Sequence, residues 1–136
     1  MSSQGEKLNL RREMPCLPDE VSEEVERIIL SLDSFDHRID DLTFRVEMAL
    51  REMLANAIEH GCRSGEEKIL IEVEAVPGRV KISVSDPGDG FDWRSANLDH
   101  MPVLEEKGRG LGMIKQAADE LKFNEKGNRI TVIFSG

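Results

Sequence analysis

The chain has 136 residues and a formal net charge of -9, with 39% hydrophobic and 33% charged residues. These values fit one folded domain over residues 1–136. They argue against a disordered chain and against sequence-independent binding to nucleic acid, whose phosphates select for basic surfaces. No apolar run approaches the roughly 20 residues that span a bilayer and the first residues are polar, so we expect a cytoplasmic protein that does not enter a membrane.

The first half of the chain predicts an edge strand followed by two helices. Alternation within residues 1–14 indicates the strand, which Pro15 ends and which could also cross to a second subunit. Apolar residues at helical spacing predict one helix over about 19–32 and a longer one over about 36–60. Gly61 ends the longer helix at the C-cap position.

The second half predicts a β-hairpin, a third helix and a closing strand. Residues 68–76 and 79–85 alternate cleanly around a proline-glycine turn, which is typical of a hairpin. A helix with a glycine-rich entry follows at 108–121, and a last strand covers 129–134 after a polar turn.

The chain contains two cysteines, Cys16 and Cys62. They are far apart in the sequence and belong to no CxxC motif or cluster of cysteine and histidine. Zinc sites and redox motifs usually show such clustering, so we expect both cysteines to be reduced thiols.

Three groups of residues could carry chemistry, and the first lies on the long helix. Glu52 and Asn56 are one turn apart and share a polar face. Asn56 offers a side-chain oxygen to Mg²⁺, which prefers oxygen ligands and substrate phosphates, and Glu52 could accept a proton. The competing interpretation is a solvated face on which Glu52 pairs with Arg45 or Arg51.

The second group is Asp86, Gly88 and Gly90, directly after the hairpin. Glycines let the backbone approach a flat ligand closely, and Asp86 can accept a hydrogen bond from an exocyclic amine such as that of a purine. The alternative is an ordinary Asp-Pro-Gly turn.

The third group opens the third helix. A helix N-terminus presents unpaired amides to an anion, and glycines allow phosphate oxygens to reach them. A glycine-rich turn that only permits tight helix packing is the alternative. The residues of this group are Gly108, Arg109, Gly110, Leu111 and Gly112.

In this order the three groups resemble the motifs of the Bergerat-fold (GHKL) ATPases. Glu52-x-x-x-Asn56 resembles the N box, Asp86-x-Gly88-x-Gly90 the first glycine box and Gly108-x-Gly110-x-Gly112 the second. The resemblance covers about residues 38–134. It implies an α+β fold, a two-layer sandwich with a mixed, mostly antiparallel sheet and helices on one face. Thr131 falls where that fold places a threonine beside the adenine-binding aspartate.

Within this superfamily the chain is most similar to the anti-sigma-factor serine kinases. It is one short domain, the segment 52–61 is close to that group's N box, and residues 91–107 make only a short ATP lid. Family members often carry an arginine just before the second glycine box, whereas here Lys107 and Arg109 flank Gly108. Either of these two cations could meet the γ-phosphate.

The resemblance implies how the site would work with ATP and Mg²⁺. Asp86 would bind the adenine amino group with support from Thr131, and Asn56 would hold Mg²⁺. The amides of residues 108–112 would cradle the phosphates, and Glu52 would act as the catalytic base.

The resemblance also implies the partners of such a serine/threonine protein kinase. The acceptor would be a serine on a STAS-type anti-anti-sigma protein, and the chain would sequester a sigma factor and form a homodimer. Two alternatives remain: a nucleotide-gated protein-binding switch without significant transfer, and a detached ATP-binding domain of a histidine kinase.

Overall fold

The computed structural model describes residues 6–90 and 111–136. Within this part, no helix has the length and apolar character needed to cross a membrane. The elements, in chain order, are β1 (Leu8–Pro15), η1 (Pro18–Glu20), α1 (Val21–Asp33), α2 (Leu42–Asn56), η2 (Ala57–Gly61), β2 (Lys68–Val76), β3 (Arg79–Ser85), α3 (Leu111–Ala117), β4 (Glu120–Phe123) and β5 (Arg129–Ser135).

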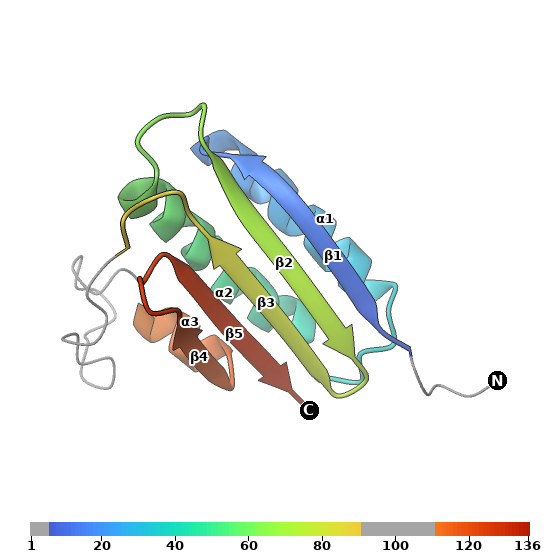
Figure 1. Ribbon diagram of the computed structural model, residues 1–136. Helices are drawn as coiled ribbons and strands as arrows, with labels where there is room; N and C mark the ends of the chain where they lie inside the picture. Colours follow the sequence, from blue (N-terminus) through green and yellow to red (C-terminus); the bar gives the residue numbers. More distant parts are fainter. Residues whose placement is uncertain (1–5, 91–110) are drawn as a thin grey trace.

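The strands form one sheet whose order is β1-β2-β3-β5-β4, and the helices cover one of its faces (Figure 1). This arrangement confirms the predicted two-layer α+β sandwich. The expectation of a mixed sheet is wrong for the described strands, because every pairing among them is antiparallel. The strands that pair across intervening helices, β1 with β2 and β3 with β5, also run in opposite directions.

The core lies between the sheet and the helices. Alternation along β2 and β3 places one apolar face against the helices, because successive strand residues point to opposite faces. The helices meet this face with stripes at helical spacing. Among the fully buried side chains are Ile28, Leu50, Met53, Leu54, Ile69, Ile71, Ile82, Ile114 and Phe134.

Two predicted helix boundaries differ from the structure. The long helix begins at Leu42 rather than near residue 36, since Arg38 and Asp41 have positive φ angles of 59° and 56° that interrupt a right-handed helix. The third helix ends at Ala117. Residues 120–123 form β4 instead, which satisfies the backbone groups along the outer side of β5.

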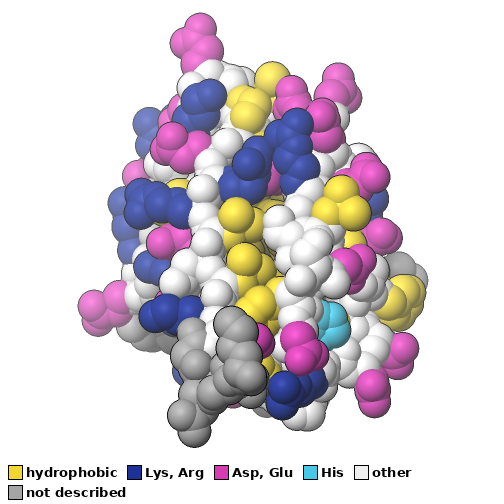
Figure 2. Space-filling view, turned by 90° about the vertical axis from the view of Figure 1, so that its right-hand side faces the viewer, with side chains coloured by type: hydrophobic (Ala, Val, Ile, Leu, Met, Phe, Trp, Pro, Cys, Tyr) yellow, Lys and Arg dark blue, Asp and Glu magenta, His cyan; other side chains and the backbone are white. Residues whose placement is uncertain are grey.

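β1 forms an edge of the sheet, as predicted. Arg12 of β1 donates to Glu24 of α1, whose side chain is buried, and this pair ties the strand to the helix. Leu8 and Leu10 of β1 are only partly buried. Figure 2 shows the side of the molecule formed by β1 and α1, where hydrophobic side chains run between charged ones.

Cys16 and Cys62 form a disulfide, with their Cα atoms 6.2 Å apart. The expectation of two reduced thiols is therefore wrong. The cysteines are 46 residues apart in the sequence, but the pairing of β1 with β2 brings the end of β1 beside the segment that precedes β2. Sequence spacing does not reveal such a long-range contact.

Candidate functional site

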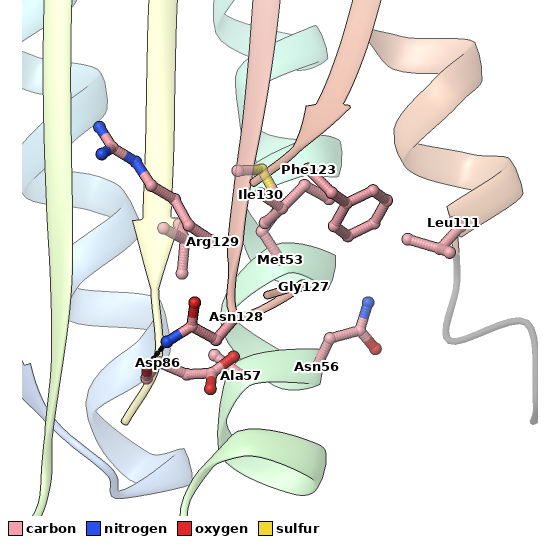
Figure 3. Close-up of a pocket in the computed structure, with 11 residues that line it drawn as sticks. Met53, Asn56, Ala57, Asp86, Leu111, Phe123, Gly127, Asn128, Arg129 and Ile130 are labelled. Carbon is pink, nitrogen blue, oxygen red and sulfur yellow. Dashed lines mark hydrogen bonds between the residues drawn. The ribbon is translucent and has the colours of Figure 1, made fainter. Parts of the chain in front are cut away.

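A pocket opens between α2, the end of β3 and the β4–β5 turn (Figure 3). Apolar side chains line most of it, and a few polar groups lie along one side, which suits a small organic ligand. The lining residues are Met53, Asn56, Ala57, Val84, Asp86, Leu111, Phe123, Gly127, Asn128, Arg129 and Ile130.

Asp86 is held from two sides where β3 ends. Its backbone N–H donates to the carbonyl of Asn128 at 2.9 Å, and the Asn128 side-chain amide donates to the Asp86 carbonyl at 3.2 Å. The Asp86 carboxylate accepts the N–H of Gly88 at 2.8 Å. These bonds fix the direction of the carboxylate beside the pocket, as Figure 3 shows.

Two glycines allow the loop after β3 to pack against the end of the long helix. A Cβ at Gly61 would overlap the carboxyl group of Asp86, and a Cβ at Gly88 would lie 2.8 Å from the Gly61 carbonyl oxygen. Gly90 has a φ of 87° and leaves no room for a Cβ against Lys126. Among the described contacts, Gly88 and Gly90 therefore shape the loop, and neither lines the pocket.

Asn56 lines the pocket from the end of α2. The helix continues directly into the π-helical turn η2, a distortion that is common at functional sites. Met53 and Ala57 line the pocket from the same face of the helix, because positions three to four residues apart are neighbours.

Glu52 is half-buried and is not among the described residues that line the pocket. The arginines that could have paired with it have other partners. Arg45 contacts Asp119 at 2.7 Å, and Arg51 donates to Ser22 at 3.0 Å. The interpretation of Glu52 as a partner in these helix ion pairs therefore loses its support.

Thr131, which was expected beside Asp86, is not among the described residues that line the pocket. Its hydroxyl bonds to Ser83 at 2.8 Å on the face of the sheet away from the helices. Ile130 lines the pocket, and the next residue along a strand must point to the other face. Asn128, in the polar turn before the last strand, donates to the Asp86 carbonyl instead.

Most of the second glycine box, Gly108 to Gly110, lies outside the described residues, and so does Lys107. Leu111 is buried and lines the pocket as the first residue of α3, and Gly112 follows it. The described residues contain no cluster of three His, Cys, Asp or Glu side chains that could hold a metal. Asn56 lines the pocket and carries the side-chain oxygen that was expected to bind Mg²⁺.

Comparisons with known proteins find relatives of this chain. The family model of the histidine kinase-like ATPase domain matches residues 17–134. The serine-protein kinase RsbW of Staphylococcus epidermidis is 29% identical over 98 residues, which are 64% of this chain and 62% of that kinase. The anti-sigma F factor of Clostridium botulinum is 32% identical over 103 residues, covering 70% of this chain and 71% of that factor. The chain thus spans less than two thirds of the length of the matched kinase.

Proposed function

This chain belongs to the histidine kinase-like ATPase domain family, and on that premise we propose that it is an ATP-dependent serine protein kinase and anti-sigma factor. The observation that carries the proposal is the apolar pocket with Asp86, Asn128 and Asn56 at its side. The proposed activity is based on the relatives, which are named serine-protein kinase and anti-sigma F factor.

The chemistry of the pocket suits the adenine of ATP. Met53, Val84 and Ile130 offer apolar surface to a flat ring. The Asp86 carboxylate accepts the hydrogen bond of the adenine amino group. A carboxylate has about four lone-pair sites and can accept several donors at once, among them the Gly88 N–H. Asn128 positions Asp86 in the role that the sequence analysis gave to Thr131.

The motifs indicate which residues would bind the phosphates and Mg²⁺. Asn56 would offer one amide oxygen to Mg²⁺, and the metal would neutralise charge on the phosphates. The amides of residues 108–112 would cradle the phosphates, as the resemblance implies. Lys107 or Arg109 neutralises charge on the γ-phosphate.

ATP supplies the phosphoryl group, and the protein supplies positioning, charge neutralisation and a base for the acceptor hydroxyl. Glu52 lies one helical turn before Asn56 and takes the proton of the incoming serine. The engagement of Arg45 and Arg51 elsewhere supports this role over a helix ion pair.

The partners are a STAS-type anti-anti-sigma protein, whose serine is phosphorylated, and a sigma factor, which the chain sequesters in the cytoplasm. A homodimer forms along the side of β1. Support for it comes from the position of β1 at the sheet edge and from the hydrophobic side chains on that side in Figure 2. The unpaired backbone groups of an edge strand can accept another strand.

Transfer of radiolabelled γ-phosphate to the cognate STAS-like protein tests this proposal. We expect a labelled partner with Mg-ATP and no label when the acceptor serine is replaced by alanine. ATP-dependent capture of the partner without labelling would favour the nucleotide-gated switch instead. Absence of ATP binding in calorimetry would contradict both functions.

A further inference from the structure

The disulfide between Cys16 and Cys62 connects the edge strand to the candidate site. Cys16 directly follows β1 and is 5% exposed. Cys62 directly follows η2, the π-helical turn after Asn56, and is partly exposed. The bond therefore anchors the end of the helix that carries Asn56.

Gly61, the residue before Cys62, contacts the Asp86 carboxyl group, which is proposed to bind the adenine of ATP. Gly61 packs so closely against the Asp86 carboxyl group that a side chain at this position would overlap it. Gly88, which donates to Asp86, also lies against the Gly61 carbonyl. A displacement of residues 61–62 must therefore move Asp86, Gly88 or both, because close-packed groups have no spare room.

The other described contacts of this segment are weaker than a covalent bond. The Cys16 N–H donates to the Glu67 carbonyl at 3.0 Å, and the Glu67 side chain accepts the backbone N–H groups of Arg63 and Ser64. Arg63 and Asp89 pair at 3.4 Å, but their side chains are 71% and 88% exposed. Exposed pairs contribute little, so these contacts keep the segment near its place without locking it.

We propose that the Cys16–Cys62 bond is a redox switch for nucleotide affinity, an inference that rests on the proposed function as an ATP-binding kinase. With the bond formed, Gly61 holds Asp86 in the binding geometry. With the bond reduced, the segment 61–67 samples other positions and only a fraction of molecules has a competent site. Disulfides of proteins in a reducing compartment are usually transient or redox-sensing, which agrees with this role.

The switching reaction is a thiol–disulfide exchange with a cellular dithiol. A thiolate of the dithiol attacks the more accessible Cys62 sulfur, the bond to Cys16 breaks, and Cys16 leaves as a thiolate that takes up a proton. The second thiolate of the dithiol then displaces Cys62 as a thiol. The protein gains two electrons and two protons, and the dithiol becomes a disulfide. An oxidised dithiol reverses the reaction.

We expect reduction to weaken ATP binding about tenfold, the loss produced when about one molecule in ten is competent. Because Gly61 packs against the Asp86 carboxyl group, which is proposed to bind adenine, adenosine should lose affinity by a similar factor. The measurement is calorimetric titration of the oxidised and the dithiothreitol-reduced protein, with far-UV circular dichroism to confirm that both are folded.

The double variant Cys16→Ser with Cys62→Ser is the control. It should bind ATP as weakly as the reduced wild type and should not respond to dithiothreitol. Equal ATP affinity of the oxidised and the reduced wild type would overturn the redox switch but leave the proposed kinase function standing. The same conclusion would follow if a thiol assay found two free thiols in protein treated with oxidised dithiol. If neither form binds ATP, the proposed function fails and the switch fails with it.

Discussion

Asp86 has its direction set before any ligand arrives. Asn128 holds its backbone, Gly88 donates to its carboxylate, and Gly61 packs against the same group. Such preorganisation lowers the entropic cost of binding, because the acceptor does not have to be ordered by the ligand. The same contacts explain why glycine is needed at position 61, where any side chain would displace the carboxylate.

Replacing Asp86 by asparagine should weaken ATP binding at least tenfold. The substitution keeps the size of the side chain but offers an amide group in place of a second acceptor oxygen, and a mispaired buried group costs about 1–3 kcal/mol. Calorimetric titration with ATP measures the change. Asp89→Asn is the matched control, because Asp89 lies in the same loop and its side chain is 88% exposed. Equal losses in the two variants would contradict the role of Asp86.

Asn128 lies in the turn before β5 and Thr131 lies within β5, and substitutions of the two residues should affect ATP binding differently. Asn128→Ala removes the bond to the Asp86 carbonyl and should weaken ATP binding several-fold, in line with a net value of about 1 kcal/mol per hydrogen bond. Thr131→Val removes the bond to Ser83 on the opposite face and should leave ATP affinity unchanged. If Thr131→Val lost ATP affinity and Asn128→Ala did not, Thr131 rather than Asn128 would be the residue that supports Asp86 in binding adenine.

Glu52→Gln should separate binding from transfer. The variant keeps the shape of the side chain, so ATP and partner affinity should stay within about threefold, while phosphorylation of the partner should fall by about 10²- to 10⁴-fold without the base. Initial rates with radiolabelled ATP give the comparison. Glu47→Gln, on another face of α2, is the control and should transfer normally. Unchanged transfer by Glu52→Gln would remove Glu52 from the catalytic role.

The contact of α2 with α3 and β5 depends on Arg45 and Asp119. Arg45 donates to the carbonyl of Ala117 at the end of α3 and to Asp119, and it also lies over the ring of Phe134. Asp119 accepts the backbone N–H of Ser135 at 2.6 Å. Arg45 of α2 thus holds the end of α3, the helix whose first residue, Leu111, lines the pocket.

These contacts make stability depend on pH. The Ser135 backbone N–H, followed by the Arg45 guanidinium, holds the pKa of Asp119 below its ordinary value of 3.8. A lowered folded-state pKa stabilises the fold above the unfolded pKa, and the contribution disappears as the pH falls through the folded pKa. Urea unfolding at pH 7 and at about pH 3 should show a larger loss for wild type than for Asp119→Asn. Because the Asp119 side chain is 46% exposed, the difference should not exceed about 1 kcal/mol.

The pocket is assembled from distant parts of one fold. Asn56 comes from the end of α2, Asp86 from the end of β3 and Asn128 from the turn before β5. They meet because β5 inserts beside β3 in the sheet and α2 packs across the face of these strands (Figure 1). The site therefore exists only when the sheet and its helical layer are complete.

Local patterns in the sequence were sufficient for the hairpin at 68–85 and for most of the long helix, whereas the fold class came from the resemblance to a known family. Strand alternation and helical spacing are short-range signals, since they arise from the geometry of neighbouring residues. The motif around Asn56 and the residues after β3 were also recognisable, and the structure places Asn56 and Asp86 at one pocket.

Other features depended on contacts between distant residues. The face to which Thr131 points, the pairing of β4 with β5 and the bond between Cys16 and Cys62 follow from strand register and sheet order. A shift of one residue along a strand reverses the face of a side chain, so the motif that suggested Thr131 could not distinguish it from Asn128. Only the tertiary structure decided which of these residues reaches Asp86, because it sets where each strand begins beside its neighbour.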